Sequence, residues 1–214
     1  MHKKKFLYIG ISVAVLAIVV SLSFSLFNND AELMPESFPE LKFTYIESNA
    51  KLKESLVLHG ISMSSPVKLS TIKDIEKFCS FFADETKQDQ VDYCTSTELR
   101  DSDGKFLGNI HMVGSRNMPK IVLVLIQTDP FMQDLDEIKS VYDVVIENLV
   151  CNCWEDVKPS EIETVSDWVD RQKDFHTSDV KPTSKSNLSI MGMSLQMELT
   201  TNTEGYLWKL LISG

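Results

Sequence analysis

The sequence predicts an α+β domain: a mostly antiparallel sheet of five or six strands with about three packed helices, preceded by one N-terminal transmembrane helix. Three observations lead to this fold class. A long uncharged segment lies near the N-terminus, two pairs of alternating segments are joined by turn residues, and two helical patterns separate those pairs. Strict alternation of strands and helices is absent, so we do not expect a doubly wound parallel sheet.

The N-terminal segment is predicted to cross a membrane. Phe6 to Phe27 contains 22 residues without a charge, which span about 33 Å as a helix, against about 30 Å for a bilayer core. Three lysines precede it and acidic residues follow it, which places residues 1–5 in the cytoplasm and the domain outside. These lysines are Lys3, Lys4 and Lys5. A cleaved signal peptide is the alternative, and it also leaves the domain outside the cytoplasm.

Residues 28–42 are predicted to be a linker, because Pro35 and Pro39 interrupt helix and polar residues dominate. Residues 43–214 then suit one extracytoplasmic domain. Without the three N-terminal lysines, 18 of the 21 basic residues face 31 acidic ones, a net charge of −13. This charge disfavours nucleic acid and anionic lipid, and favours cationic or neutral partners. The five-residue tail is too short to hold a signalling domain.

The first half of the domain is predicted to contain strands around one helix. Residues 55–63 suggest a strand that Pro66 interrupts and residues 67–69 continue. A helix is expected over residues 71–83, where Thr71 and Asp74 resemble a capping box. Its predicted buried face consists of Ile72, Ile75, Cys79 and Phe82. Segment 43–54 is ambiguous.

A hairpin follows, with arms at residues 91–99 and 106–113 and a turn at 101–104. Residues 121–126 form a run of six apolar residues, which suits a central strand buried on both faces.

The second half is predicted to contain two helices, a loop and a closing hairpin. Asp129-Pro130 suggests the first helix start, and Ser160 with Glu163 suggests a capping box for the second. The expected buried stripes are Ile138, Val141, Tyr142, Val145 and Leu149 on the first helix, and Ile162, Val165, Trp168, Val169 and Phe175 on the second. Residues 177–187 suggest a loop. Residues 191–199 and 206–212 alternate on either side of a turn at 202–205.

The four cysteines suggest two different pairs. Cys79 and Cys94 lie 15 residues apart, on a helix and the next strand, and are candidates for a disulfide. A bridge between Cys151 and Cys153 would close a very short ring and be easily reduced, so this pair suits redox or metal chemistry. His176 or His111 could supply a third metal ligand. The alternative is ordinary unpaired cysteine that packs as a small hydrophobe.

Other patterns have competing interpretations. Asp101 and Asp103 could offer oxygen to calcium, but the position expected to carry the last EF-hand ligand is Met112, and a hairpin turn explains both residues. Four methionines could bind Cu(I), but their spacing also suits a buried strand face. These are Met112, Met191, Met193 and Met197. Asn187-Leu188-Ser189 is an N-glycosylation acceptor pattern. No hydrolase, phosphate-loop or dinucleotide motif occurs.

Two short segments and the overall layout resemble an uncharacterised family of membrane-anchored archaeal proteins. The resemblance rests on the lysine-led anchor, the acidic outer domain, CNCWEDVKP at 151–159 and GYLWKLLIS at 205–213. It covers most of the chain and implies no activity, cofactor or catalytic residue.

The sequence therefore predicts a membrane-tethered extracytoplasmic binding or interaction module, which could serve as an accessory subunit of a membrane assembly. One alternative is a copper-, zinc- or thiol-handling protein that uses Cys151 and Cys153. The other is a hydrolase whose site is assembled in space.

Overall fold

The computed structural model describes residues 39–82, 85–178 and 181–214. The predicted tail, the anchor at 6–27 and most of the linker lie outside these residues. Within the described residues, no helix is both long enough and apolar enough to span a membrane.

The described residues contain one antiparallel sheet of eight strands, more than the five or six expected. The strand order is β1-β3-β4-β5-β8-β7-β6, with β2 also paired to β3. The strands are β1 (Ser62–Met63), β2 (Val67–Leu69), β3 (Tyr93–Arg100), β4 (Phe106–Gly114), β5 (Pro119–Thr128), β6 (Thr183–Ile190), β7 (Met193–Asn202) and β8 (Gly205–Ser213).

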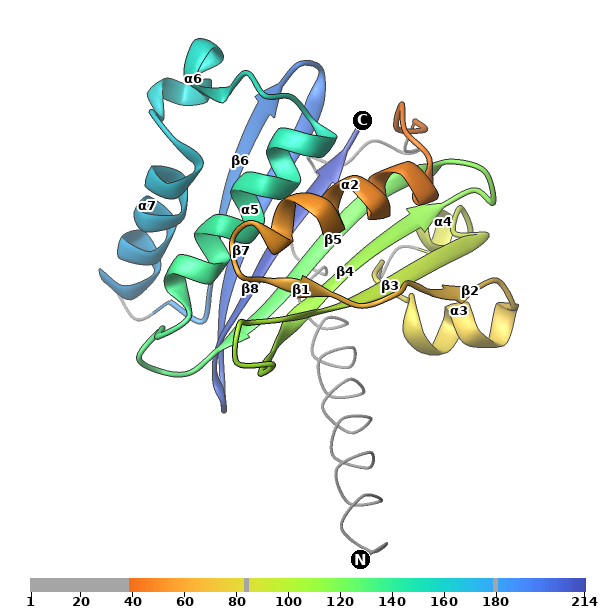
Figure 1. Ribbon diagram of the computed structural model, residues 1–214, viewed down its shortest axis with the longest axis horizontal. Coiled ribbons are helices and arrows are strands. Elements are labelled where there is room, and N and C mark those ends of the chain that lie inside the picture. The colour runs from red at the N-terminus through yellow and green to blue at the C-terminus, as the bar shows by residue number, and fades with distance from the viewer. Residues whose placement is uncertain (1–38, 83–84, 179–180) are drawn as a thin grey trace, which may run out of the picture.

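Helices lie on both faces of this sheet (Figure 1). One face carries α2 (Tyr45–Val57), α5 (Leu135–Leu149) and α7 (Val165–Ser178). The short helices α3 (Ile72–Phe78) and α4 (Glu85–Gln88) lie at the β3 side of the molecule. The chain between α5 and α7 forms α6 (Trp154–Val157) and a 3-10 turn at Pro159–Glu161.

The central strand β5 divides the hydrophobic interior into two cores. Val122, Val124 and Ile126 pack with α2, α5 and α7, whereas Ile121, Leu123 and Leu125 belong to the cluster that includes Ile75 of α3. All six apolar side chains of this run are buried. The prediction of a strand buried on both faces is therefore confirmed, and the α+β class with it.

The predicted strand at 55–63 is wrong, because α2 continues to Val57 and only Ser62–Met63 form β1. Thr44 and Glu47 make a complete capping box at the start of α2. Its buried residues are Tyr45, Ser48, Asn49, Leu52 and Leu56. Two polar side chains in this buried stripe conceal its helical period in the sequence.

Three predicted helix ends also differ from the structure. Helix α3 stops at Phe78, short of 83, and Ile72 is 77% exposed. Asp129 accepts backbone hydrogen bonds in a turn, and α5 begins only at Leu135. Ser160 has a positive φ in the 3-10 turn, whereas Thr164 and Asp167 cap α7. The predicted stripe on α5 is buried as expected.

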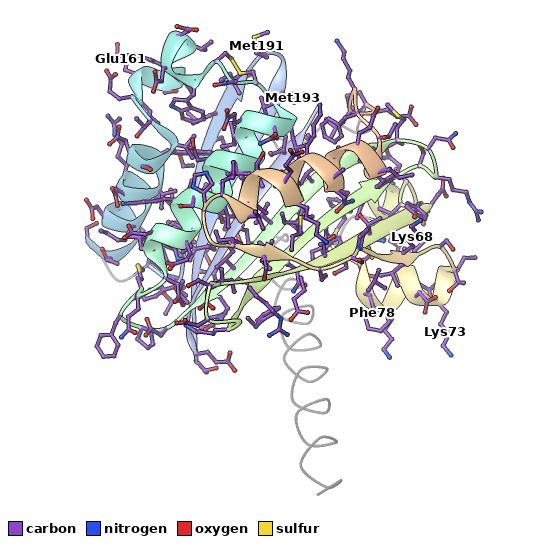
Figure 2. The ribbon with its side chains drawn as sticks, viewed as in Figure 1. Lys68, Lys73, Phe78, Glu161, Met191 and Met193 are labelled. Carbon is purple, nitrogen blue, oxygen red and sulfur yellow. A yellow bond between two sulfur atoms is a disulfide. The ribbon has the colours of Figure 1, made fainter. Side chains whose placement is uncertain are left out.

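The predicted loop at 177–187 contains most of the edge strand β6. Its many Ser, Thr and Lys side chains reflect an edge position, where one side of the strand has no partner strand in the described part of the chain. Met191 lies in the β6–β7 turn with a positive φ and is 70% exposed, and Met193 begins β7 (Figure 2). Phe175 is also exposed, so three members of the predicted buried sets, Ile72, Phe175 and Met191, lie at the surface.

Candidate functional site

A hollow of about 420 Å³ lies between the start of α2, strands β2 and β3, and the β4–β5 turn. It is larger than the two other hollows described below, and its volume lies within the usual range for small-molecule sites. We name it the tyrosine pocket. Its lining residues are Thr44, Tyr45, Ile46, Asn49, Pro66, Lys68, Tyr93, Thr95, Arg116, Asn117 and Met118.

Two tyrosines form an aromatic wall of this pocket. The rings of Tyr45 and Tyr93 meet edge to face with their centroids 4.9 Å apart. The Tyr45 hydroxyl donates a hydrogen bond to the Ser115 carbonyl at 2.8 Å, which fixes the β4–β5 turn against α2. Burial raises the pKa of Tyr45 above its usual value, and the charges of Glu40 and Asp92 add to this effect. The phenol is therefore a neutral donor at physiological pH.

The inner side of the pocket carries buried polar groups. Asn49 donates from its amide nitrogen to the Tyr45 carbonyl at 2.7 Å and accepts from the Thr97 hydroxyl at 3.1 Å. Thr95 is 2% exposed, and its hydroxyl oxygen has no hydrogen-bond partner among the described residues. A buried hydroxyl without a partner is costly, because it has given up its bonds to water.

Two cations stand at the mouth of the tyrosine pocket. Lys68 lies on β2, opposite Thr95 in the sheet register, and Arg116 lies in the β4–β5 turn (Figure 2 labels Lys68). Both side chains are exposed, and within the described residues neither forms an ion pair. A positive mouth above aromatic walls is suited to a small molecule with an apolar ring and a negative group.

A second hollow surrounds the predicted redox pair. Cys151 and Cys153 are joined by a disulfide, and both are partly exposed. They line a hollow of about 240 Å³, which we name the cysteine hollow. Its lining residues are Asp143, Ile146, Glu147, Cys151, Asn152, Cys153, Trp154, Glu155, Asp156 and Val165.

The cysteine hollow is strongly acidic. Four of its lining residues carry carboxylates, and none of the lining residues is basic. Desolvation raises the pKa of Asp143, and the charge of Glu147 raises it further, whereas His59 opposes the shift. The hollow therefore presents negative charge beside a disulfide.

The structure does not bring His176 to this pair. Its Nδ1 lies 2.9 Å from the Ser184 hydroxyl of β6 and its Nε2 lies 2.8 Å from the Thr201 hydroxyl of β7, so the ring bridges α7 to these two strands. Both ring nitrogens are thus engaged, and His176 holds elements together. Among the described residues, no group of three or more His, Cys, Asp or Glu side chains is arranged to hold a metal ion.

His111, the other candidate ligand, lies on the opposite face of the sheet from α2. It is 3% exposed, packs against the Phe81 ring, and its Nδ1 has no partner among the described residues. Burial lowers the pKa of His111 to about 4. A hollow of about 260 Å³ is lined there by Ser64, Val67, Leu69, Phe78, Ser96, Glu98, Asn109 and His111. Within the described residues, no hydrogen bond links His111 to Ser96 or Glu98.

The other residues singled out from the sequence lie at a disulfide, in a turn, in the core and on an edge strand. Cys79 and Cys94, the pair expected from the sequence, are joined in a disulfide. Asp101 accepts backbone hydrogen bonds from Asp103 and Lys105, as a turn residue does. Met112 and Met197 are buried in the core on the α2 side of the sheet. Asn187 is exposed on the edge strand β6, where an attached glycan would meet solvent.

Sequence reasoning missed the tyrosine pocket. Its residues come from four separate segments, at 44–49, 66–68, 93–95 and 116–118, and no motif joins them. The one usable signal was the possible pairing of the segments at 67–69 and 93–100, whose antiparallel register places Lys68 opposite Thr95.

No protein-family model matches this chain, and no curated protein or solved structure is significantly similar to it. The resemblance to membrane-anchored archaeal proteins therefore stays a prediction.

Proposed function

We propose that the protein is a membrane-tethered binding module, held outside the cytoplasm, whose tyrosine pocket takes a small organic anion. The observation that carries this proposal is the pair of cations, Lys68 and Arg116, at the mouth of an aromatic-walled hollow. Neither cation is neutralised by a carboxylate among the described residues, although the whole chain has a net charge of −10. Two unpaired cations on so acidic a chain favour an anion locally.

The walls narrow the ligand class further. The Tyr45 and Tyr93 rings offer apolar surface and ring edges, which suit an aromatic or other flat apolar group. Lys68 and Arg116 would meet a carboxylate or sulfonate at the open side, where a charged group keeps part of its hydration. Asn117, which is exposed at the pocket, adds an amide group that can orient a polar substituent.

Benzoate is a suitable probe, because it joins a phenyl ring to a carboxylate. We expect isothermal titration of the full chain in non-ionic detergent to show saturable one-to-one binding. Arg116→Gln and Lys68→Gln should each weaken binding about three- to tenfold, since a charge-assisted contact is lost. Arg171→Gln is the matched control, because Arg171 is an exposed arginine on α7, away from the pocket. Equal effects of the three variants, or no saturable binding, would refute the proposal.

The tether follows from the uncharged segment at 6–27 and the lysines before it. Protease added to intact cells or right-side-out vesicles should digest the domain at 43–214. Protection of that domain, with an accessible N-terminus, would contradict the proposed topology.

An accessory role in a membrane assembly is a natural use for such a module, because the predicted anchor at 6–27 would hold the domain beside other membrane proteins. Mild extraction of native membranes, with cross-linking, should recover the chain together with a membrane protein. Migration of the chain alone would remove this part of the proposal.

A further inference from the structure

The two disulfides differ in exposure and in ring size. Cys79 and Cys94 are both 0% exposed, and 15 positions separate them in the sequence. Cys151 and Cys153 are partly exposed, and only Asn152, which is exposed, lies between them. A thiol in solution can therefore approach the second disulfide and not the first.

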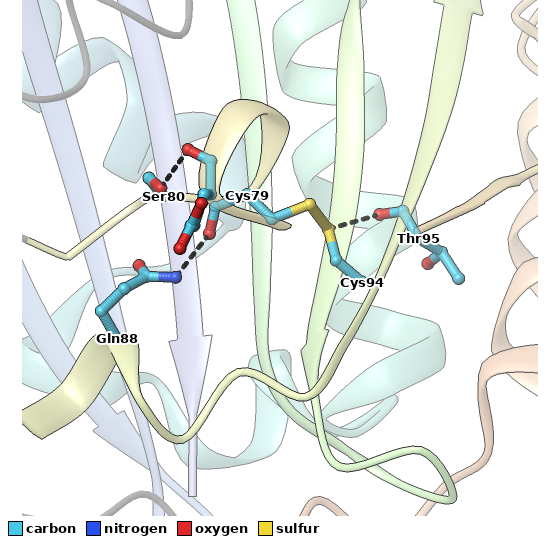
Figure 3. The surroundings of a disulfide bond; sticks show 6 residues. Cys79, Ser80, Gln88, Cys94 and Thr95 are labelled. Atoms are coloured by element: carbon cyan, nitrogen blue, oxygen red, sulfur yellow. Dashed lines mark hydrogen bonds between the residues drawn. A yellow bond between two sulfur atoms is a disulfide. The ribbon is translucent and has the colours of Figure 1, made fainter. Parts of the chain in front are cut away.

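The buried disulfide has a structural role. It joins the C-terminal end of α3 to β3, and the Gln88 side chain donates to the Cys79 carbonyl at 3.2 Å (Figure 3). In the chain-entropy model, closing a loop of this length stabilises a fold by lowering the entropy of the unfolded chain. The same model gives about half as much stabilisation for the ring between Cys151 and Cys153. The exposed disulfide therefore adds less to stability, although it takes up two of the four cysteines.

The exposed disulfide is also placed in a distinct electrostatic setting. Asp143 and Glu147 project from α5, and Glu155 and Asp156 belong to α6, so carboxylates reach the cysteine hollow from both adjoining helices. Such a hollow concentrates cations and repels anions, most strongly at low ionic strength.

We propose that Cys151–Cys153 is an exchangeable disulfide that oxidises dithiols on positively charged partners, independently of the tyrosine pocket. A partner thiolate attacks one sulfur of the pair, the Cys151–Cys153 bond breaks, and a mixed disulfide forms. The released sulfur takes up a proton. The second thiolate of the partner then attacks the first sulfur of the partner, which is bonded to the protein in the mixed disulfide, and that bond breaks. The partner leaves with a disulfide, and the pair is left as two thiols that carry the two protons of the partner.

The carboxylates around the disulfide indicate that a partner should carry positive charge. A cationic group beside the reacting thiol is drawn toward Asp143 and Glu147, whereas an anionic group is repelled. The sulfurs of Cys151 and Cys153 are bonded to each other in the oxidised protein, so neither is present as a thiolate. The attacking thiolate must accordingly come from the partner.

Two thiols of similar size test this proposal on the full chain. Cysteamine carries a positive group and 2-mercaptoethanesulfonate a negative one, and each is oxidised to its own disulfide as it reduces the pair. Reaction is stopped at intervals by alkylation, and peptide mass spectrometry reads each disulfide separately. We expect Cys151–Cys153 to be reduced while Cys79–Cys94 stays intact. Per thiolate, cysteamine should react at least about tenfold faster, and added salt should shrink this difference.

A pair of variants tests the role of the carboxylates. Asp143→Asn with Glu147→Gln should bring the two thiol rates closer together. Glu76→Gln with Asp89→Asn removes the same charge from α3 and from the residue after α4, and should leave the difference intact. Reduction of both disulfides together, or of neither below the unfolding transition, would overturn the exchange proposal. Selective reduction without a preference for cysteamine would overturn the assignment of a cationic partner.

Discussion

Two neighbouring threonines on β3 provide a sharp prediction about the tyrosine pocket. Thr95 and Thr97 point to the same face of the sheet and are 2% and 1% exposed. The Thr97 hydroxyl donates to Asn49 Oδ1 at 3.1 Å, whereas the Thr95 hydroxyl has no partner among the described residues. Valine replaces threonine with almost the same shape and without the hydroxyl, so the pair isolates the value of one hydrogen bond.

The two substitutions should have opposite signs. A buried polar group left without a partner costs about 1–3 kcal/mol, so Thr95→Val should raise the free energy of unfolding by about 1 kcal/mol. Thr97→Val removes a made bond and leaves Asn49 Oδ1 unpaired, so it should lower the free energy of unfolding by about 1–2 kcal/mol.

Urea unfolding of the full chain, followed by circular dichroism, measures both values with wild type as reference. Equal destabilisation by both variants would show that Thr95 has a partner in solution, and the account of the pocket floor would be wrong. Asn49→Ala is a further check, because it removes the acceptor of Thr97. In that background the Thr97 hydroxyl has lost its partner, as the Thr95 hydroxyl lacks one, so Thr97→Val should no longer lower the free energy of unfolding and should raise it slightly.

Three other predictions concern the rest of the fold. His111 has a folded-state pKa of about 4, below its value in the unfolded chain, so stability should be lost as pH falls. The free energy of unfolding should fall by about 2 kcal/mol between pH 7 and pH 5. His111→Phe should remove this pH dependence. Phe81→Leu should lower the free energy of unfolding by the same amount at both pH values and so leave the pH dependence unchanged. Cys79→Ala with Cys94→Ala should lower the free energy of unfolding, measured by chemical denaturation, by about 3 kcal/mol. This loss should be about twice the loss caused by replacing Cys151 and Cys153 with alanine. Equal losses would contradict the assigned roles of the two disulfides. Gly108→Ala should lower the free energy of unfolding by about 2 kcal/mol or more, because the added Cβ would lie 2.0 Å from the Leu125 carbonyl oxygen. An unchanged melting temperature would argue against the β4–β5 register.

The sequence predicted those elements whose hydrophobic period is unbroken. The hairpins at β3–β4 and β7–β8 alternate on both arms and turn at glycine, and α5 carries five buried residues at helical spacing. Strand β5 is apolar on both faces because both faces are covered. In these segments, local preference and tertiary packing agree.

The elements that were missed have polar residues in buried or edge positions. Helix α2 buries Ser48 and Asn49, which satisfy their side chains on backbone carbonyls one turn earlier. Strand β6 buries Ser184 under the His176 ring nitrogen. In each case, a hydrogen bond that depends on the folded chain replaces the apolar contact that periodicity detects.

The two candidate sites also differ in how far the sequence could predict them. The cysteine hollow was suggested by a local pair of residues, whereas His176 was not brought to it, because the fold uses both of its ring nitrogens elsewhere. Net charge suggested cationic or neutral partners, and the acidic lining of the cysteine hollow carries the same sign of charge as the whole chain. The mouth of the tyrosine pocket carries positive charge, opposite in sign to the net charge of the chain, so the net charge could not predict it.

A crystal structure of the protein grown with benzoate tests the central claim most directly. We predict that the phenyl ring lies against Tyr45 and Tyr93, with the carboxylate within hydrogen-bond distance of Lys68 or Arg116. Benzoate bound elsewhere, or a tyrosine pocket that stays empty at saturating benzoate, would contradict the proposal that this domain binds small organic anions.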